Sequence, residues 1–234
     1  MLNQDNPKLM QGDCLERMKE IESGSIDMVL TDPPYEISNS GGGMTNRNKR
    51  GFLRKIDEMG MCKSNFDVTG FLDVCLEKFT HKNKFCGVFF CSIKQLSNYL
   101  VWAKNKGLQF GVGVWYKSNP APLCNFKYLN DVEYWVYIKG NKSKILGNYH
   151  SKSMVYSSQV NKKDKKLYGH PTIKPINIIK KFLVNHSIEN QTILDPFMGS
   201  GTTGVAAKNL NRKFIGIELD ETYFNIAKDR INNA

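Results

Sequence analysis

The tetrapeptide Asp32-Pro33-Pro34-Tyr35 has the residue types needed to bind and activate a planar amino group. It follows an apolar segment, 27–31, that we expect to form a buried strand. The two prolines fix the backbone and remove two N–H donors, so carbonyl acceptors remain beside a carboxylate and an aromatic ring. The exocyclic amine of a nucleobase could donate to Asp32 and to the Pro33 carbonyl while Tyr35 stacks on the base. The amine would then be a nucleophile for direct methyl transfer. A structural Pro-Pro turn is the alternative for the tetrapeptide alone.

A second motif, G-x-G-x-x-G, is formed by Gly199, Gly201 and Gly204 after an apolar segment that ends at Asp195. With Glu218 closing the next expected strand, this is the arrangement of a nucleotide-binding βαβ unit. The Asp195 carboxylate would repel a dinucleotide's pyrophosphate, but it suits the sulfonium and ammonium groups of S-adenosylmethionine. Glu218 would then accept hydrogen bonds from the ribose hydroxyls. An NAD-dependent dehydrogenase and a glycine turn without a ligand are the alternatives.

The elements that must position these motifs are indicated by short apolar runs that alternate with helical patterns, which is typical of an α/β sheet. With 234 residues, of which 41% are hydrophobic, the chain can bury one sizeable core, and 1–234 is predicted to be a single catalytic domain. Strands are expected over 8–11, 27–31, 86–92, 110–117, 132–139, 191–195 and 213–218. Helices are expected around 72–79 and 96–103, from Asp13 onward, and over about 222–232.

The net charge of +11 is concentrated in two polar segments. Residues 41–63 carry a net charge of +4 and residues 139–170 carry +7, so the rest of the chain is neutral as a whole. We interpret 36–63 as a mobile basic loop and the two segments as an electrostatic footprint for a polyanion. Solvated loops would have the same composition and are the alternative. The candidate nucleic-acid contacts are Arg47, Lys49, Arg50, Lys162, Lys163, Lys165 and Lys166.

Three motifs in a fixed order carry a family resemblance. The tetrapeptide at 32–35, the segment His170-Pro171-Thr172-Ile173-Lys174-Pro175 and the glycine loop at 195–202 together resemble the S-adenosylmethionine-dependent DNA amino-methyltransferases (adenine-N6 and cytosine-N4), in the motif order of the β class. The resemblance implies a Rossmann-like methyltransferase fold, with a seven-stranded, mostly parallel sheet in permuted order and helices on both faces. It also implies a cofactor site made of Asp13, Cys14, His170, Thr172, Lys174, Asp195, Phe197, Gly199, Ser200, Gly201, Thr202 and Glu218.

The expected substrate is double-stranded DNA, whose target base must be flipped out to reach the cofactor. Adenine is favoured because the catalytic motif begins with Asp32 rather than with the serine typical of cytosine-N4 relatives, and cytosine-N4 methylation is the alternative. We predict a target-recognition insert over 118–169. A catalytically silent DNA-binding subunit and methylation of RNA or of a protein glutamine are further alternatives.

The surroundings of the protein are predicted from the same observations. Its six cysteines form no C-x-x-C pair, so we expect neither a metal site nor disulfides. The sequence has no apolar run long enough to cross a membrane, which favours a cytoplasmic protein encoded by a bacterium or a phage. Restriction-modification is the expected setting, with a cognate restriction endonuclease as one candidate partner and a second copy of the chain as another.

Overall fold

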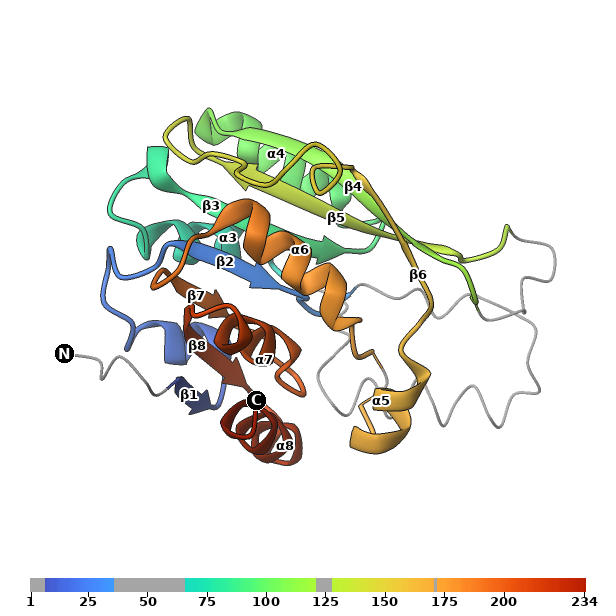
Figure 1. Cartoon of the computed structure of the whole chain (residues 1–234). Helices are drawn as coiled ribbons and strands as arrows, with labels where there is room; N and C mark the ends of the chain where they lie inside the picture. Colours follow the sequence, from blue (N-terminus) through green and yellow to red (C-terminus); the bar gives the residue numbers. More distant parts are fainter. Residues whose placement is uncertain (1–6, 36–65, 121–127, 171) are drawn as a thin grey trace.

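The computed structural model describes residues 7–35, 66–120, 128–170 and 172–234, which form an eight-stranded sheet with helices on both faces (Figure 1). The strand order is β1-β8-β7-β2-β3-β5-β4-β6. The strands are β1 (Lys8–Gln11), β2 (Met28–Thr31), β3 (Cys86–Cys91), β4 (Gln109–Lys117), β5 (Val132–Lys139), β6 (Val155–Ser158), β7 (Thr192–Asp195) and β8 (Lys213–Glu218).

Helices pack on each side of this sheet. Figure 1 shows α6 and α7 in front of the strands, with α3 and α4 behind them. The helices are α1 (Cys14–Met18), α3 (Val68–Glu77), α4 (Leu96–Lys106), α5 (Lys162–Tyr168), α6 (Ile176–His186), α7 (Thr202–Asn209) and α8 (Glu221–Asn232), with a short 3-10 helix at Lys82–Lys84. In the described ranges, no helix combines the length and the apolar character that crossing a membrane would require.

The sheet confirms the permuted, mostly parallel arrangement. The glycine-loop strand β7 lies between β8 and the catalytic strand β2, although β2 comes much earlier in the chain, and these pairings are parallel. Among the described strands only β5 runs against the others, because it pairs antiparallel with both β3 and β4. The carboxyl ends of β1, β8, β7, β2 and β3 therefore share one edge, which is where α/β proteins bind their ligands.

The expected number of seven strands is wrong, because β6 adds an eighth strand parallel to β4. Its four residues alternate between exposed and half-buried, so this edge strand has no apolar run that could have revealed it. The seven-residue helix α5 lies in the same polar segment, has no buried residue and was also not predicted. The predicted recognition segment 118–169 also contains β5, which is an inner strand, so this segment is not separate from the catalytic sheet.

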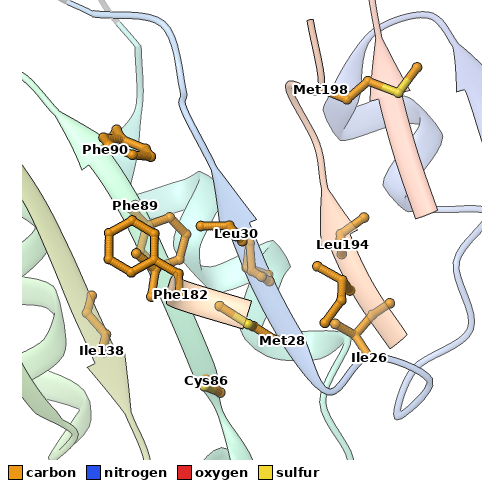
Figure 2. Packing of buried hydrophobic residues seen from close by; sticks show 14 of the residues in the cluster. Ile26, Met28, Leu30, Cys86, Phe89, Phe90, Ile138, Phe182, Leu194 and Met198 are labelled. Atoms are coloured by element: carbon orange, nitrogen blue, oxygen red, sulfur yellow. The ribbon is translucent and has the colours of Figure 1, made fainter. Parts of the chain in front are cut away.

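The hydrophobic core holds β2, β3 and β7 in place, and the candidate site residues follow β2 and β7 at their carboxyl ends. Every residue of β2, β3 and β7 is buried, as expected for strands covered on both faces. Figure 2 shows Met28 and Leu30 of β2 close to Phe89 of β3 and Leu194 of β7. Burying each of these side chains contributes about 1.5–3 kcal/mol.

Helix α6 was not predicted, and it holds the segment before it against the sheet. Its Phe182 ring is fully buried, with its centroid 4.8 Å from that of Trp135 on β5 and 5.8 Å from that of Phe90 on β3. Pro175 is the N-cap of α6, so residues 172–174 lead into the helix, and all three line the cavity. The hydrophobic face of α6 thus determines where the His170 and Lys174 side chains lie.

Candidate active site

A cavity of about 270 Å³ lies at the carboxyl edge of the sheet. It is lined by residues that follow β1, β2, β7 and β8, by the segment before α6, and by side chains from β4 and β5. The structure brings together here most of the residues that the sequence predicted. These are Asp13, Cys14, Asp32, Pro33, Pro34, Tyr35, Lys165, His170, Thr172, Lys174, Asp195, Phe197, Gly199, Ser200, Thr202 and Glu218.

The catalytic tetrapeptide presents acceptors to this cavity. Gln95 Nε2 donates to the Pro34 carbonyl at 2.8 Å and thereby fixes the turn after β2. Asp32 Oδ2 is hydrogen-bonded to the Lys174 ammonium. Asp32 Oδ1 is buried and receives no hydrogen bond within the described part of the chain. Because a buried acceptor without a donor is costly, this oxygen is suited to an N–H group that a substrate brings.

A carboxylate that the sequence did not single out, Glu133 on β5, lies behind the tetrapeptide. Its Oε1 accepts from Lys174 Nζ at 2.7 Å and from the Tyr35 hydroxyl at 2.9 Å, and its Oε2 accepts from Lys117 Nζ at 2.9 Å. Burial alone would raise the pKa of Glu133, but Lys174 and Lys117 outweigh it and lower this pKa to about 2. Burial would lower the pKa of Lys174, yet Asp32 and Glu133 raise it above its usual value. Glu133 and Lys174 are therefore both charged at neutral pH, whereas burial raises the pKa of Asp32 and Lys174 opposes that rise.

The position of Lys174 changes its interpretation. The family resemblance placed this lysine with the cofactor, but its ammonium contacts Asp32 and Glu133 and lies 4.7 Å from the centroid of the Phe90 ring. Only 8% of its side chain is exposed. Lys174 therefore lies in the half of the cavity that holds Asp32 and Glu133.

The other half of the cavity is acidic. Asp195 Oδ1 accepts from the Thr31 hydroxyl at 2.6 Å and from the Phe197 amide at 3.2 Å, and burial raises the pKa of this carboxyl to about 6. Glu218 accepts from the Gly199 amide at 2.8 Å, which joins the tip of β8 to the glycine loop. Burial also raises the pKa of Glu218. A ligand with cationic groups and hydroxyl donors would stabilise both ionised carboxylates.

His170 is held as a neutral imidazole. Its Nδ1 accepts from the Thr172 amide at 3.3 Å, so the ring proton is on Nε2. Nε2 is buried and has no hydrogen-bond partner among the described residues. Burial, together with repulsion from Lys174, lowers the pKa of His170 to about 3. The ring is therefore a weak base, and its N–H can donate to an anionic or polar group of a ligand. Both this orphaned donor and the acidic half of the cavity fit S-adenosylmethionine, which carries a carboxylate as well as two cationic groups.

Gly201 is the predicted cofactor residue of the glycine loop that does not line the cavity. It has a φ of +81° at the start of α7, and a Cβ there would lie 2.9 Å from the Cβ of Ala227 on α8. Its role is therefore to let α7 and α8 approach each other. Its neighbours Gly199 and Ser200 do line the cavity.

Replacing Gly201 with alanine is expected to lower the free energy of unfolding by about 2–4 kcal/mol, because backbone strain and overlap with α8 add together. Gly107, the C-cap of α4, is the matched control: its φ is +68°, but no atom lies within 4 Å of the position that a Cβ would take. Gly107→Ala should cost only about 1 kcal/mol. Urea denaturation of both variants measures the difference, and equal losses would contradict the packing role of Gly201.

The predicted DNA-contact residues are divided by the structure. Lys162, Lys163 and Lys166 of α5 are exposed, whereas Lys165 is half-buried and lines the cavity. Helix α5 is connected to the glycine loop through Arg230, whose guanidinium lies 4.2 Å from the Tyr168 ring centroid and donates to the Ser200 carbonyl at 2.6 Å. Arg47, Lys49, Arg50 and the predicted loop 36–63 lie outside the described residues.

The residues that sequence reasoning missed are Glu133, Lys117 and Gln95. Glu133 and Lys117 are charged residues at the ends of two strands that were predicted correctly. The sequence feature that could have pointed to Glu133 and Lys117 is a charged residue at the end of an otherwise apolar or aromatic run. Their meeting depends on the antiparallel pairing of β4 with β5, in which Trp115 lies opposite Glu133. That pairing could not be read from residue spacing.

A buried carboxylate oxygen without a donor among the described residues, in one cavity with two further carboxylates on a permuted α/β sheet, is the arrangement expected of a methyltransferase that acts on amino groups. The profile of the DNA methylase family N6_N4_Mtase matches residues 26–229, and the chain belongs to this family. It is 32% identical to the "Type II methyltransferase M2.LlaDCHI" of Lactococcus lactis subsp. cremoris, over 98% of this chain and 91% of that protein. It is 28% identical to the "Type II methyltransferase M.HinfI" of Haemophilus influenzae, over 95% of this chain and 67% of that protein.

Solved structures agree with the fold. The M1.HpyAVI complex with S-adenosylmethionine superposes with a TM-score of 0.73 at 27% identity, covering 97% of this chain and all of that one (100%). The PvuII DNA methyltransferase, which is described as cytosine-N4-specific, superposes with a TM-score of 0.70 at 18% identity, covering 96% of this chain and 86% of that one. The similarity to the PvuII enzyme, at 18% identity, shows that the fold is shared and says nothing about the target base. The protein is an S-adenosylmethionine-dependent DNA methyltransferase.

Proposed function

We propose that this protein methylates the N6 amino group of adenine at a specific site in double-stranded DNA. The observation that carries the proposal is the buried Asp32 Oδ1, which lacks a donor among the described residues and lies in the same cavity as Asp195 and Glu218. Among bases with an amino group, adenine is favoured because the motif begins with an aspartate. Cytosine-N4 methylation is the second candidate, since its amine could use the same acceptors.

The chain's own residues prepare the amine for reaction. Asp32 Oδ1 accepts one N–H of the target amine and the Pro33 carbonyl accepts the other, which withdraws the nitrogen lone pair from conjugation. The Tyr35 ring supports the flipped base by stacking. S-adenosylmethionine supplies the methyl group when bound. The ionised Asp32 stabilises the positive charge that develops on the amine nitrogen, and the amine proton leaves after transfer, so no strong base is needed. The low pKa of His170 is consistent with this.

Tritium transfer from labelled S-adenosylmethionine to DNA, followed by nucleoside chromatography, tests the proposal. N6-methyldeoxyadenosine is the expected product. N4-methyldeoxycytidine would replace the proposal with its alternative, and label in RNA or protein, or in no polymer, would contradict both. Sequencing of modified bases in DNA from an expressing host would then identify the recognition site.

We further propose that the exposed face of α5 contacts the DNA backbone. Replacing Lys162, Lys163 and Lys166 together with glutamine is expected to weaken DNA binding and to reduce the salt slope of the binding constant by up to about 2.7, because each phosphate contact contributes about 0.9. S-adenosylmethionine affinity should not change. Fluorescence anisotropy of labelled duplex over a range of salt concentrations measures the slope.

The control for this prediction removes exposed lysines from the opposite edge of the sheet. Lys82 and Lys84 precede β3 at its amino end, far from the carboxyl edge that holds the cavity, and both are exposed. Their replacement with glutamine should leave the slope unchanged. If the α5 variant behaved like this control, its lysines would be ordinary solvated charges.

The wider setting is part of the same proposal. Relatives named Type II methyltransferases support a bacterial cytoplasmic enzyme of a restriction-modification system, with a cognate endonuclease that acts on the same site. Residues 118–169 together with 36–63 are proposed to provide target recognition on a single catalytic domain. A homodimer is a prediction that sedimentation velocity of the purified protein would test.

A further inference from the structure

Glu133 lies at the centre of a buried charge cluster that connects three parts of the fold. Its side chain is 13% exposed and accepts hydrogen bonds from Lys174, Tyr35 and Lys117. Lys174 in turn binds Asp32, the carboxylate proposed to accept the target amine. With two carboxylates and two ammonium groups, the cluster is neutral as a whole. Lys174 is hydrogen-bonded to both Glu133 and Asp32 and so links the two carboxylates.

We propose that Glu133 is a positioning residue for methyl transfer, which shares the Lys174 ammonium with Asp32 and holds the hydroxyl of Tyr35. This inference rests on the proposed function, since it assigns a purpose to residues that act behind Asp32 and Tyr35. Burial raises the pKa of Asp32, whereas Lys174 opposes that rise and so favours the ionised form. Glu133 provides Lys174 with a second acceptor, so that Lys174 does not pair with Asp32 alone.

The sharing matters because of the charge that develops during the reaction. Positive charge on the methylated amine is stabilised by Asp32 and opposed by any ammonium that remains on the same carboxylate. Lys174 has a second acceptor in Glu133 Oε1 at 2.7 Å, so its charge is divided between two carboxylates. Without that acceptor, Lys174 would pair fully with Asp32, and the negative charge available to the amine would be smaller.

The second part of the role concerns the ring of Tyr35. A phenol has one proton to donate, and the Tyr35 hydroxyl gives it to Glu133 Oε1 at 2.9 Å. This bond fixes the rotation and tilt of the ring from its far end. A stacking surface that is fixed before the base arrives loses less conformational freedom when the base binds.

The variant Glu133→Gln tests the inference, because glutamine has the same shape but no charge. We expect kcat with saturating DNA to fall about 10- to 100-fold, the range for loss of hydrogen bonds to a charged group. The dissociation constant for S-adenosylmethionine and the KM for DNA should stay close to those of the wild type. Lys117→Met, which removes a partner of Glu133 that touches neither Asp32 nor Tyr35, is the matched control and should lower kcat less.

The double variant Glu133→Gln with Lys117→Met separates positioning from charge balance. It again leaves equal numbers of positive and negative groups in the cluster, but it does not return an anionic acceptor to Lys174. We expect it to remain as slow as Glu133→Gln. Recovery of the wild-type kcat in the double variant would overturn the inference, since charge balance alone would then explain the effect.

Tyr35→Phe provides a readout that a purely structural role of Glu133 would not change. It keeps the ring and removes the hydroxyl, so it should lower kcat in the wild-type background and cause a smaller further loss in Glu133→Gln, whose uncharged amide oxygen is a weaker acceptor for this hydroxyl. 2-Aminopurine at the target position reports the same coupling, because weaker stacking on Tyr35 raises its fluorescence in both variants. Independent, multiplicative losses in kcat would overturn the inference.

The outcomes also distinguish this inference from the proposed function. If the wild-type protein methylates no DNA, the proposed function fails and the inference fails with it. If the wild type is active and Glu133→Gln keeps its kcat, only the inference fails. Circular dichroism confirms that each variant is folded. Should Glu133→Gln not fold, Tyr35→Phe in the wild-type background decides, and an unchanged kcat there overturns the inference.

Discussion

Replacing Asp32 with asparagine is expected to lower kcat for DNA methylation by about 100- to 1000-fold, the loss typical when a positioned electrostatic group is removed from an active site. An asparagine oxygen could still accept the amine N–H, but it would bring no negative charge to the developing cation. Its amide nitrogen would also face the Lys174 ammonium, so two hydrogen-bond donors would replace the ion pair of Asp32 with Lys174. Single-turnover transfer of a labelled methyl group measures the rate directly.

The control for Asp32 is a carboxylate on the opposite end of the same strand. Asp27 precedes β2 at its amino end, where it accepts from the Thr192 amide at 2.8 Å. Asp27→Asn keeps that acceptor and should leave kcat unchanged. S-adenosylmethionine should bind Asp32→Asn within a few-fold of the wild type, because Asp195 and Glu218 are untouched. A near-normal rate in Asp32→Asn would require a different amine acceptor.

Replacing Asp195 with asparagine is expected to weaken S-adenosylmethionine binding about 100-fold, because a buried carboxylate that faces a cationic ligand is lost. In the wild type the affinity should depend on pH. Burial raises the pKa of Asp195 to about 6 in the free protein, and the ligand's positive groups need the ionised form. The affinity should therefore fall as the pH drops below about 6, approaching tenfold per pH unit. Isothermal titration calorimetry between pH 5 and 8 measures both effects.

The same substitution should stabilise the free protein at neutral pH. Because the pKa of Asp195 is raised from 3.8 to about 6, the folded protein binds a proton there more tightly than the unfolded chain does. This carboxyl favours folding below about pH 4, and that contribution is lost as the pH rises to about 6. Asparagine removes the buried charge and should raise the free energy of unfolding at pH 7 by up to about 3 kcal/mol.

Asp220→Asn is the control for Asp195. Asp220 caps α8 by accepting from the Tyr223 amide at 2.9 Å, does not line the cavity, and can be replaced in this role by asparagine. Its variant should bind S-adenosylmethionine normally and keep the pH dependence. If Asp195→Asn kept the wild-type affinity and pH dependence, the acidic half of the cavity would not be where the cationic groups bind.

The strand and motif positions could be predicted because they depend on local signals. The boundaries of β5 and β8 agree with the expected 132–139 and 213–218, since each is an apolar or aromatic run that ends in polar residues. The Asp32 and Asp195 motifs each follow such a run, so their meeting at one edge follows from parallel pairing.

What could not be predicted depends on contacts between distant segments or on surfaces with little apolar character. The ion pair of Lys174 with Glu133 joins two elements that are far apart in the sequence. Edge strand β6 and helix α5 have no buried residue to create a pattern. Helix α6 is the exception: buried Ile178, Ile179, Phe182 and Leu183 have helical spacing, so its signal was present in the sequence.

The strand order also has a consequence for synthesis on the ribosome. β1 and β2 are made first, but they are not neighbours: β8 and β7 lie between them. β1 therefore has no partner in the described sheet, and β2 pairs only with β3, until residues 192–218 have emerged. Such long-range pairing is expected to make folding slow and late. A nascent chain that already carries its amine-binding residues would have no place for the methyl donor, so methylating activity should begin only after the central strands have been added.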